Sequence, residues 1–210
     1  MKVLIFGASG GTGRELVNQG LQQGLAVTAF VRNPAGFMIR HPNLTITQGD
    51  VTDRGGVEQV VGGHDAAVSA LGGSTLLKRD SDLTMGVHNI LNAMEQAQVR
   101  RFVYLSADMV PEARSELNPF RRYVVGSVLL RNVGADHELN ERLIEASRLD
   151  WTIVRPPVLT SGPRTGAYRI GEHLKANSFI PRISRADVAD FLLRALRDDT
   201  LLHRKLLVMR

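Results

Sequence analysis

A glycine-rich turn near the amino terminus constrains the fold of this chain more than any other feature. The turn GASGGTG, residues 7–13, stands between an apolar run at Lys2–Phe6 and a stretch that reads as a helix. Gly7 permits the tight turn, Gly10 removes a Cβ that would keep a pyrophosphate from the backbone, and Gly13 lets the helix pack closely on the strand. The amino end of the helix then offers free N–H groups and a partial positive charge to phosphates.

The surroundings of this turn predict a dinucleotide site. A strand, a glycine turn and a helix at the start of an alternating chain are the context in which the motif binds a dinucleotide. We expect the cofactor to contact six residues of the turn: Gly7, Ser9, Gly10, Gly11, Thr12 and Gly13. The turn lacks the Lys-Ser/Thr ending of a P-loop, which disfavours nucleotide hydrolysis. An ordinary glycine-rich turn with nothing bound is the alternative.

Strand-like and helix-like runs alternate from the first residue, a pattern typical of βαβ units around a parallel sheet. The six runs predicted as strands are Lys2–Phe6, Ala26–Val31, Leu44–Gln48, Asp65–Ala70, Arg101–Leu105 and Asp150–Val154. The 210 residues, 43% of them hydrophobic, contain no linker, repeat or low-complexity tract. The sequence therefore predicts an α/β fold, a Rossmann-type doubly wound, mostly parallel sheet in a single domain over residues 1–210.

Three later helices are predicted from apolar residues spaced three and four apart. The first begins at a cap formed by Ser81-Asp82, and the second spans about Ala135–Ser147. The third begins at Ser184, a good N-cap with Asp187 three residues on.

Two segments, about 109–134 and 156–179, show no sustained periodic pattern of apolar residues, and each follows the end of a predicted strand. In open α/β sheets, ligands bind outside the carboxyl ends of the strands. These segments are therefore candidate substrate loops.

The end of the second strand indicates which dinucleotide is bound. NAD-binding proteins place an acidic residue there, on the ribose 2′-hydroxyl, but no acidic residue occurs between Leu16 and Gly49. Arg32 stands at this point, and its guanidinium could pair with a 2′-phosphate, so we expect NADP(H). A surface arginine that caps a turn before Asn33-Pro34 is the alternative. Asp50-Val51, after the third strand, is expected near the adenine, although Asp50 could equally be a turn or helix-start residue.

Composition excludes several classes of function. The net charge is +5, but the arginines are scattered and form no basic stripe, so we expect solvated surface and no nucleic acid partner. There is no cysteine, and the six histidines show no metal-ligand spacing, so no metal is expected. Neither a signal peptide nor an apolar stretch of the ~20 residues that span a bilayer is visible, which predicts a cytoplasmic protein with no membrane partner.

The acid–base pair of classical short-chain dehydrogenases is missing. That pair needs a tyrosine and a lysine four residues apart, because the ammonium lowers the pKa of the tyrosine. At this spacing the three tyrosines are followed by Asp108, Ser127 and Glu172. Alcohol oxidation and sugar epimerisation by that mechanism are therefore not expected.

The chain resembles the atypical short-chain dehydrogenases with NmrA-like NAD(P)-binding domains. Within this family it looks most like the branch of biliverdin reductase B, also called flavin reductase. The resemblance covers nearly the full length. Besides the glycine turn it rests on Val31-Arg32, Gly49-Asp50-Val51, Leu71-Gly72, Val103-Tyr104-Leu105-Ser106-Ala107, Arg155-Pro156-Pro157, Thr165-Gly166-Ala167-Tyr168 and Ile183-Ser184-Arg185-Ala186-Asp187. The double proline and the last two segments are the more specific to the flavin-reductase branch.

The resemblance implies NADPH-dependent reduction of a small planar acceptor over an open, shallow site, in a monomer. The implied acceptor is a flavin such as FMN or riboflavin, as a substrate and not as a tightly bound group, or else a quinone or a bilin. Related reductases carry a histidine at the position of Val158. This departure puts bilin reduction in more doubt than flavin reduction.

The resemblance also maps a substrate-side serine onto Ser106. A hydroxyl there would orient and polarise the acceptor beside the nicotinamide, and a turn serine that bonds its own backbone is the alternative. The expected cofactor contacts beyond the turn are Arg32, Asp50, Val51, Leu71, Gly72, Ser106 and Pro156. The expected acceptor contacts are Asp108, Arg155, Val158 and Tyr168, for which surface or packing roles are the alternative.

Two functions are consistent with these features. The first is a reductase in which a flat acceptor stacks on the reduced nicotinamide and needs little acid–base machinery. The second is a non-catalytic NADP(H)-sensing regulatory protein, which would also need the turn and Arg32.

Overall fold

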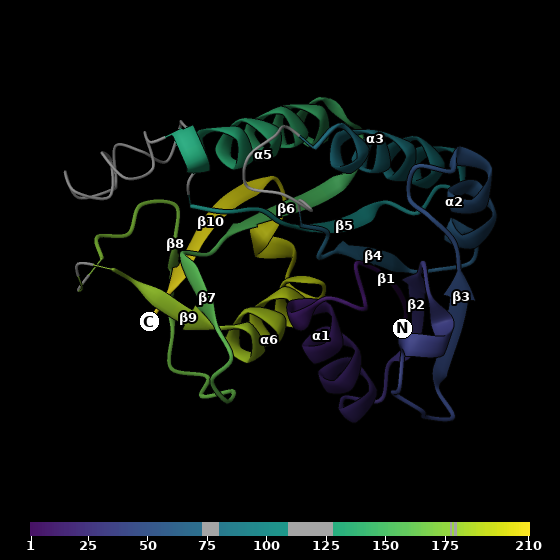
Figure 1. The fold of residues 1–210 in the computed structure, drawn as a ribbon, viewed down its shortest axis with the longest axis horizontal. Helices are drawn as coiled ribbons and strands as arrows, with labels where there is room; N and C mark the ends of the chain where they lie inside the picture. The colour runs from purple at the N-terminus through teal and green to yellow at the C-terminus, as the bar shows by residue number, and fades with distance from the viewer. Residues whose placement is uncertain (73–79, 109–127, 177, 179) are drawn as a thin grey trace.

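An eight-stranded sheet forms the centre of the computed structural model, which describes residues 1–72, 80–108, 128–176, 178 and 180–210 (Figure 1). The strands lie in the order β3-β2-β1-β4-β5-β6-β10-β8. Their bounds are β1 Lys2–Phe6, β2 Ala26–Val31, β3 Leu44–Gln48, β4 Ala66–Ser69, β5 Arg101–Leu105, β6 Asp150–Arg155, β8 Arg169–Gly171 and β10 Arg204–Met209. All neighbours pair in parallel except β8, which runs antiparallel to β10.

Helices cover both faces of this sheet (Figure 1). Helices α1 (Gly11–Gln22) and α6 (Arg185–Ala195) lie on one face. Helices α2 (Arg54–Val61), α3 (Ser81–Gln96) and α5 (Val128–Ala146) lie on the other. Short 3-10 turns occur at Pro34–Gly36 and Asp199–Leu201, and β7 (Val158–Thr160) pairs in parallel with β9 (Arg182–Ser184) outside the main sheet.

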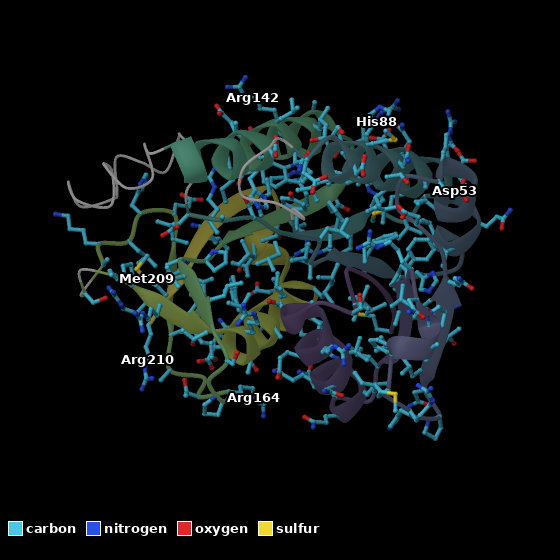
Figure 2. All side chains as sticks on the ribbon, in the orientation of Figure 1. Asp53, His88, Arg142, Arg164, Met209 and Arg210 are labelled. Carbon is cyan, nitrogen blue, oxygen red and sulfur yellow. The ribbon has the colours of Figure 1, made fainter. Side chains whose placement is uncertain are left out.

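The core consists of two apolar layers, one on each side of the sheet. Along β1, Val3 and Ile5 join the layer under α1 and α6, whereas Leu4 and Phe6 join the layer under α2, α3 and α5. Successive side chains of a strand point to opposite faces, so a strand buried on both faces must be apolar throughout. Arg142 of α5, in contrast, points outward from the helix and is mostly exposed (Figure 2).

The order of the strands places a topological switch point between β1 and β4. From β1 the chain winds outward through β2 and β3, and then returns to wind the other way through β4, β5 and β6. The connections after β1 and β4 therefore diverge and leave a crevice beyond the carboxyl ends of these strands. The glycine turn follows β1 directly, so it borders this crevice.

The predicted fold class is confirmed, and the six predicted strands are present to within one residue at either end. The third predicted helix begins as expected, because the Ser184 hydroxyl accepts a hydrogen bond from the N–H of Asp187 at 2.9 Å. The cap predicted at Ser81-Asp82 is wrong by one residue. Asp80 is the N-cap of α3, and its carboxylate accepts from the N–H of Leu83 at 3.1 Å.

Both predicted substrate loops need correction. Residues 128–134 belong to α5, so the predicted segment 109–134 is wrong at its carboxyl end, and its residues 109–127 lie outside the described residues. The segment 156–179 contains the short strands β7 and β8. Strands of three residues are too short to show a period, which explains why the sequence reads there as a loop.

None of the helices among the described residues is both long enough and apolar enough to cross a membrane.

Candidate functional site

The glycine turn after β1 leaves the backbone of Gly10 and Gly11 exposed at the start of α1. Gly7 has a φ of 74°, and a Cβ there would stand 2.6 Å from the carbonyl oxygen of Ala70. A Cβ at Gly13 would overlap the carbonyl oxygen of Gly7. These two glycines are therefore required by packing within the turn and against the end of β4.

The amino end of α1 has neither a side-chain cap nor an acidic residue of its own. Gly10 is the N-cap, so no side chain bonds to the first N–H groups, and the first turn contains no acidic residue. Of the described residues, only Gly7 would come within 4 Å of a Cβ at Gly10, with its carbonyl oxygen at 3.3 Å. No acidic side chain of this turn neutralises the first N–H groups of the helix, an arrangement that favours an anion.

A first hollow lies on the β2 and β3 side of the turn, with a volume of about 240 Å³. It is lined by Gly7, Ser9, Gly10, Phe30, Val31, Arg32, Gly49, Asp50, Val51, Thr52, Ala70, Leu71, Gly72, Asp80, Asp82 and Leu83. The structure therefore brings the turn together with Arg32, Asp50 and Val51, as predicted from the strand ends. The acidic residues Asp80 and Asp82, on the far wall, were not predicted.

Within this hollow, Arg32 is exposed and Asp50 braces the loop after β3. The Asp50 carboxylate accepts hydrogen bonds from the N–H of Thr52 at 2.9 Å and from its hydroxyl at 2.8 Å. These bonds, with a smaller contribution from the Arg32 charge, lower the pKa of Asp50 below its ordinary value. Asn89 of α3 fixes the same loop through the carbonyl oxygens of Val51 and Thr52. Asp50 is therefore a turn residue that also lines the hollow.

A second, larger hollow of about 580 Å³ lies on the β5 and β6 side of the turn. It is lined by Gly10, Gly11, Thr12, Ala70, Leu71, Gly72, Leu105, Ser106, Ala107, Asp108, His137, Pro156, Pro157, Val158, Leu159 and Arg185. The two hollows share Gly10 and the segment 70–72, so they adjoin across the carboxyl ends of β1 and β4. Most of the second hollow is apolar, with a few polar groups on its wall.

Ser106 lies on the wall of the second hollow, but its hydroxyl is already engaged. Its Oγ donates to Oε1 of Glu141 at 2.5 Å, because a carboxylate paired with a cation can only accept. That cation is Arg155, which donates to Glu141 from Nε at 3.1 Å and from Nη2 at 2.5 Å. All three residues are buried.

The four predicted acceptor contacts divide into two pairs. Asp108 and Val158 line the second hollow, Asp108 buried and Val158 47% exposed. Arg155 is instead turned into the buried ion pair with Glu141. Tyr168 packs edge-on against Phe191 and donates to the carboxylate of Asp190 at 2.7 Å. Neither Arg155 nor Tyr168 lines either hollow.

Burial and the neighbouring Asp190 carboxylate raise the pKa of Tyr168 well above its ordinary value. This tyrosine therefore keeps its proton, and its hydrogen bond ties the loop before β8 to α6.

Among the lining residues of the second hollow that were not predicted, two have titratable side chains, His137 and Arg185. Cδ of Arg185 lies 2.7 Å from the point where a Cβ of Gly11 would stand, so the side chain crosses the start of α1. Its only hydrogen bond to a described residue is a long one of 3.4 Å to the hydroxyl of Ser161. The segment Ile183–Asp187, one of those that carry the family resemblance, contains this arginine. The sequence alone did not single it out, because an arginine in the first turn of a helix usually lies on the surface.

Among the described residues, no group of three or more His, Asp or Glu side chains is arranged to hold a metal ion.

Known proteins related in sequence indicate the family of this chain. A family model described as NAD(P)H-binding matches residues 7–199. An uncharacterized chloroplastic protein of Arabidopsis thaliana is 32% identical over 180 residues, which are 79% of this chain and 61% of that protein. A 3-beta-hydroxysteroid dehydrogenase of Mycolicibacterium neoaurum is 33% identical over 120 residues, 52% of this chain and 32% of that protein. The chain thus spans about a third to three-fifths of the length of these two relatives.

Solved structures share the fold over nearly the whole chain. The anaerobilin reductase ChuY of Escherichia coli O157:H7 superposes with a TM-score of 0.79 at 20% identity, covering 99% of this chain and 96% of that one. A short-chain dehydrogenase/reductase of Veillonella parvula DSM 2008, solved in complex with NADP, gives 0.80 at 18% identity, covering 100% and 94%. Because the family model spans the glycine turn and both hollows, this chain belongs to the NAD(P)H-binding family.

Proposed function

We propose that this chain is an NADPH-dependent reductase that transfers hydride to a small planar acceptor, with a flavin such as FMN or riboflavin as the substrate. The observation that carries the proposal is the pair of adjoining hollows at the carboxyl ends of β1 and β4. One bears an exposed arginine and the other is mostly apolar, and the phosphate-binding turn lies between them. This order suits an adenosine 2′-phosphate, a pyrophosphate and a nicotinamide in sequence.

The residues present fit such a cofactor. The space beside Gly10 and the bare N–H groups of α1 would receive the pyrophosphate. Arg32 would pair with the 2′-phosphate that distinguishes NADPH from NADH. When bound, the reduced nicotinamide supplies the hydride.

Arg185 supports the same arrangement by its electrostatics. A guanidinium at the positive end of a helix is unfavourable unless an anion lies between them. Among the described residues, no carboxylate forms an ion pair with Arg185, although its side chain crosses the start of α1. A pyrophosphate on the turn would supply the missing negative charge, so we assign Arg185 to the cofactor.

The second hollow favours a flat, conjugated acceptor over an alcohol or a sugar. Among the described residues, its wall contains leucine, valine and proline side chains and no tyrosine or lysine. A stacked acceptor needs close, aligned contact with the nicotinamide more than it needs a strong acid or base. The fold shared with an anaerobilin reductase and with a protein that binds NADP agrees with this proposal.

Steady-state turnover tests the proposal. The purified chain is assayed with NADPH or NADH against FMN, riboflavin and a quinone. We expect oxidation of NADPH with at least one of these acceptors, and a higher kcat/KM for NADPH than for NADH. Tight NADPH binding without turnover of any acceptor would overturn the proposed reductase function. The function that would then remain is that of an NADP(H)-sensing regulator.

A further inference from the structure

His137 is a buried histidine that lines the second hollow, as Ser106 does. It lies on α5, and only 6% of its surface is exposed. Its Nδ1 lies 3.1 Å from the hydroxyl of Tyr104, and the two rings meet edge to face with their centroids 6.0 Å apart. The other ring nitrogen, Nε2, forms no hydrogen bond with any described residue.

A chain of hydrogen bonds from the core defines which nitrogen of His137 carries the hydrogen. Asn140 Nδ2 donates to the Tyr104 hydroxyl at 3.2 Å. Burial raises the pKa of Tyr104 well above its ordinary value, so the tyrosine keeps its hydrogen and must donate it. The acceptor within reach is Nδ1 of His137. The ring hydrogen of His137 is then on Nε2.

Ser106 cannot serve as the donor to a ligand in this arrangement. Its hydroxyl hydrogen is directed at Glu141, which Arg155 holds in place with two hydrogen bonds. A hydroxyl that donates in one direction still has lone pairs to accept in another. Toward the hollow, Ser106 is therefore an acceptor, suited to an N–H group such as that of a carboxamide.

We propose that His137 is the hydrogen-bond donor of this site, with its Nε2–H directed at an electron-rich carbonyl oxygen or ring nitrogen of the acceptor. This inference rests on the proposed reductase function. It also changes the role expected of Ser106, which would orient the bound ligand but would not polarise the acceptor. Related reductases carry a histidine where this chain has Val158, and His137 lines the same hollow from a different element.

The proposed donor acts on the charge that develops during reduction. Hydride transfer breaks the C–H bond at C4 of the reduced nicotinamide and forms a new bond to the acceptor. The nicotinamide is oxidised, and the acceptor is reduced by two electrons and gains one negative charge. A positioned N–H group stabilises that charge in the transition state. A proton from water then completes the reduction.

The surroundings of His137 suit a donor that does not give up its proton. Burial lowers the pKa of His137 to about 4, so the ring is neutral at pH 7. A neutral imidazole is a weak acid but a good hydrogen-bond donor. The Nδ1 contact with Tyr104 fixes the orientation of the ring.

Nitrogen NMR of histidine-labelled protein tests the geometry without any turnover. We expect His137 as the neutral Nε2–H tautomer at pH 7, and we expect its Nε2 signal to shift when FMN is added to the complex with NADP⁺. His64 is the matched control, because it is buried and bonded to Thr28 and Val61 away from both hollows. An Nδ1–H tautomer, or an Nε2 signal of His137 that FMN leaves in place, would overturn the inference.

Two substitutions test the donor in catalysis. His137→Leu removes the donor, and kcat with FMN should fall about 100-fold. The KM for NADPH should stay within about threefold, since the donor contributes mainly in the transition state. His137→Gln keeps an N–H near the position of Nε2 and should recover most of kcat, whereas His64→Gln should leave kcat unchanged.

The outcomes separate this inference from the proposed function. If the wild type turns over FMN and His137→Leu does so with the same kcat, only the role of His137 is overturned. Failure of the wild type to turn over any acceptor would overturn both.

Discussion

Arg32 and Arg185 line different hollows on the two sides of the glycine turn, so their removal should affect different parts of one ligand. Arg32 lines the first hollow and Arg185 crosses the start of α1. A hydrogen bond to a charged group contributes about 1.5–3 kcal/mol, or roughly tenfold or more in affinity. Arg32→Ala should therefore lower the affinity for both NADP⁺ and the fragment 2′,5′-ADP about tenfold, as measured by titration calorimetry.

Arg185→Ala should weaken the binding of NADP⁺ by a similar factor and leave the affinity for 2′,5′-ADP nearly unchanged. The reason is that this fragment lacks the phosphate on the nicotinamide side of the pyrophosphate. Arg142→Ala is the control for loss of one positive charge, since Arg142 points outward from α5 (Figure 2). Equal losses of 2′,5′-ADP affinity in the Arg32 and Arg185 variants would contradict this division of roles.

Arg155 illustrates the difference between a buried and an exposed ion pair. Its side chain and that of Glu141 are 8% and 3% exposed. Removing one partner leaves an uncompensated buried charge, which costs about 3–5 kcal/mol. Arg155→Leu should lower the free energy of unfolding in urea by this amount. Arg100→Ala breaks the exposed pair with Asp150 and should cost less than about 1 kcal/mol. Similar losses in the two variants would contradict the structural role of Arg155.

His137 should make the stability of the fold depend on pH. Its pKa is about 4 in the folded chain and about 6.5 when unfolded. As pH falls below 6.5 the unfolded chain binds a proton that the folded chain does not, so stability is full above pH 6.5 and is lost down to about pH 4. Urea unfolding at pH 7 and pH 4.5 should show a larger loss for the wild type than for His137→Gln. Equal losses would show that His137 is not buried in its neutral form.

At the level of residues, the sequence could predict groups that follow strand ends but not groups delivered by helices. Ser106 and Asp108 follow β5, and carboxyl ends of parallel strands meet at one edge, so both were expected near the site. His137 and Glu141 lie four residues apart on α5, where a polar residue reads as solvent-facing. Only the packing of α5 on the sheet brings them beside Ser106.

At the level of elements, the turn before α1 gives the sharpest test of the glycine argument. An alanine Cβ at position 13 would overlap the carbonyl oxygen of Gly7, so α1 would have to shift away from β1. Gly13→Ala should cost about 2 kcal/mol or more of stability and abolish NADPH binding. Gly24 is the matched control. It has a φ of 75° but open space around a Cβ, so Gly24→Ala should cost only about 1 kcal/mol and bind NADPH normally.

Thermal or urea unfolding together with NADPH titration of the two variants makes the comparison. Normal NADPH binding by Gly13→Ala would contradict the proposed placement of the pyrophosphate on this turn.

Elements were predictable where one local signal dominated. The buried strands are continuous apolar runs, and α6 has a side-chain cap at Ser184. Helix α2 was not predicted, because Gly55 and Gly56 in its first turn lower its helix propensity. Its start depends on the Asp53 carboxylate, which accepts from the N–H of Gly55 at 3.1 Å. Strand β10 was also missed, although Leu206–Met209 is apolar, since its place beside β6 depends on the return of the chain from α6.

At the level of the whole molecule, strand order explains why one edge of the sheet holds both hollows. The reversal of winding between β1 and β4 opens the crevice, and the turn after β1 faces it. The proposed binding of cofactor and of acceptor would therefore follow from one topology, with acceptor preference left to His137 of α5 and to residues 156–159 after β6.

The central claim is that this crevice binds NADPH in preference to NADH, and titration calorimetry of the wild-type chain with each cofactor tests it most directly. We expect saturable binding of both, with NADPH at least about tenfold tighter because of its additional phosphate contact. Equal dissociation constants, or no heat with either cofactor, would contradict the account.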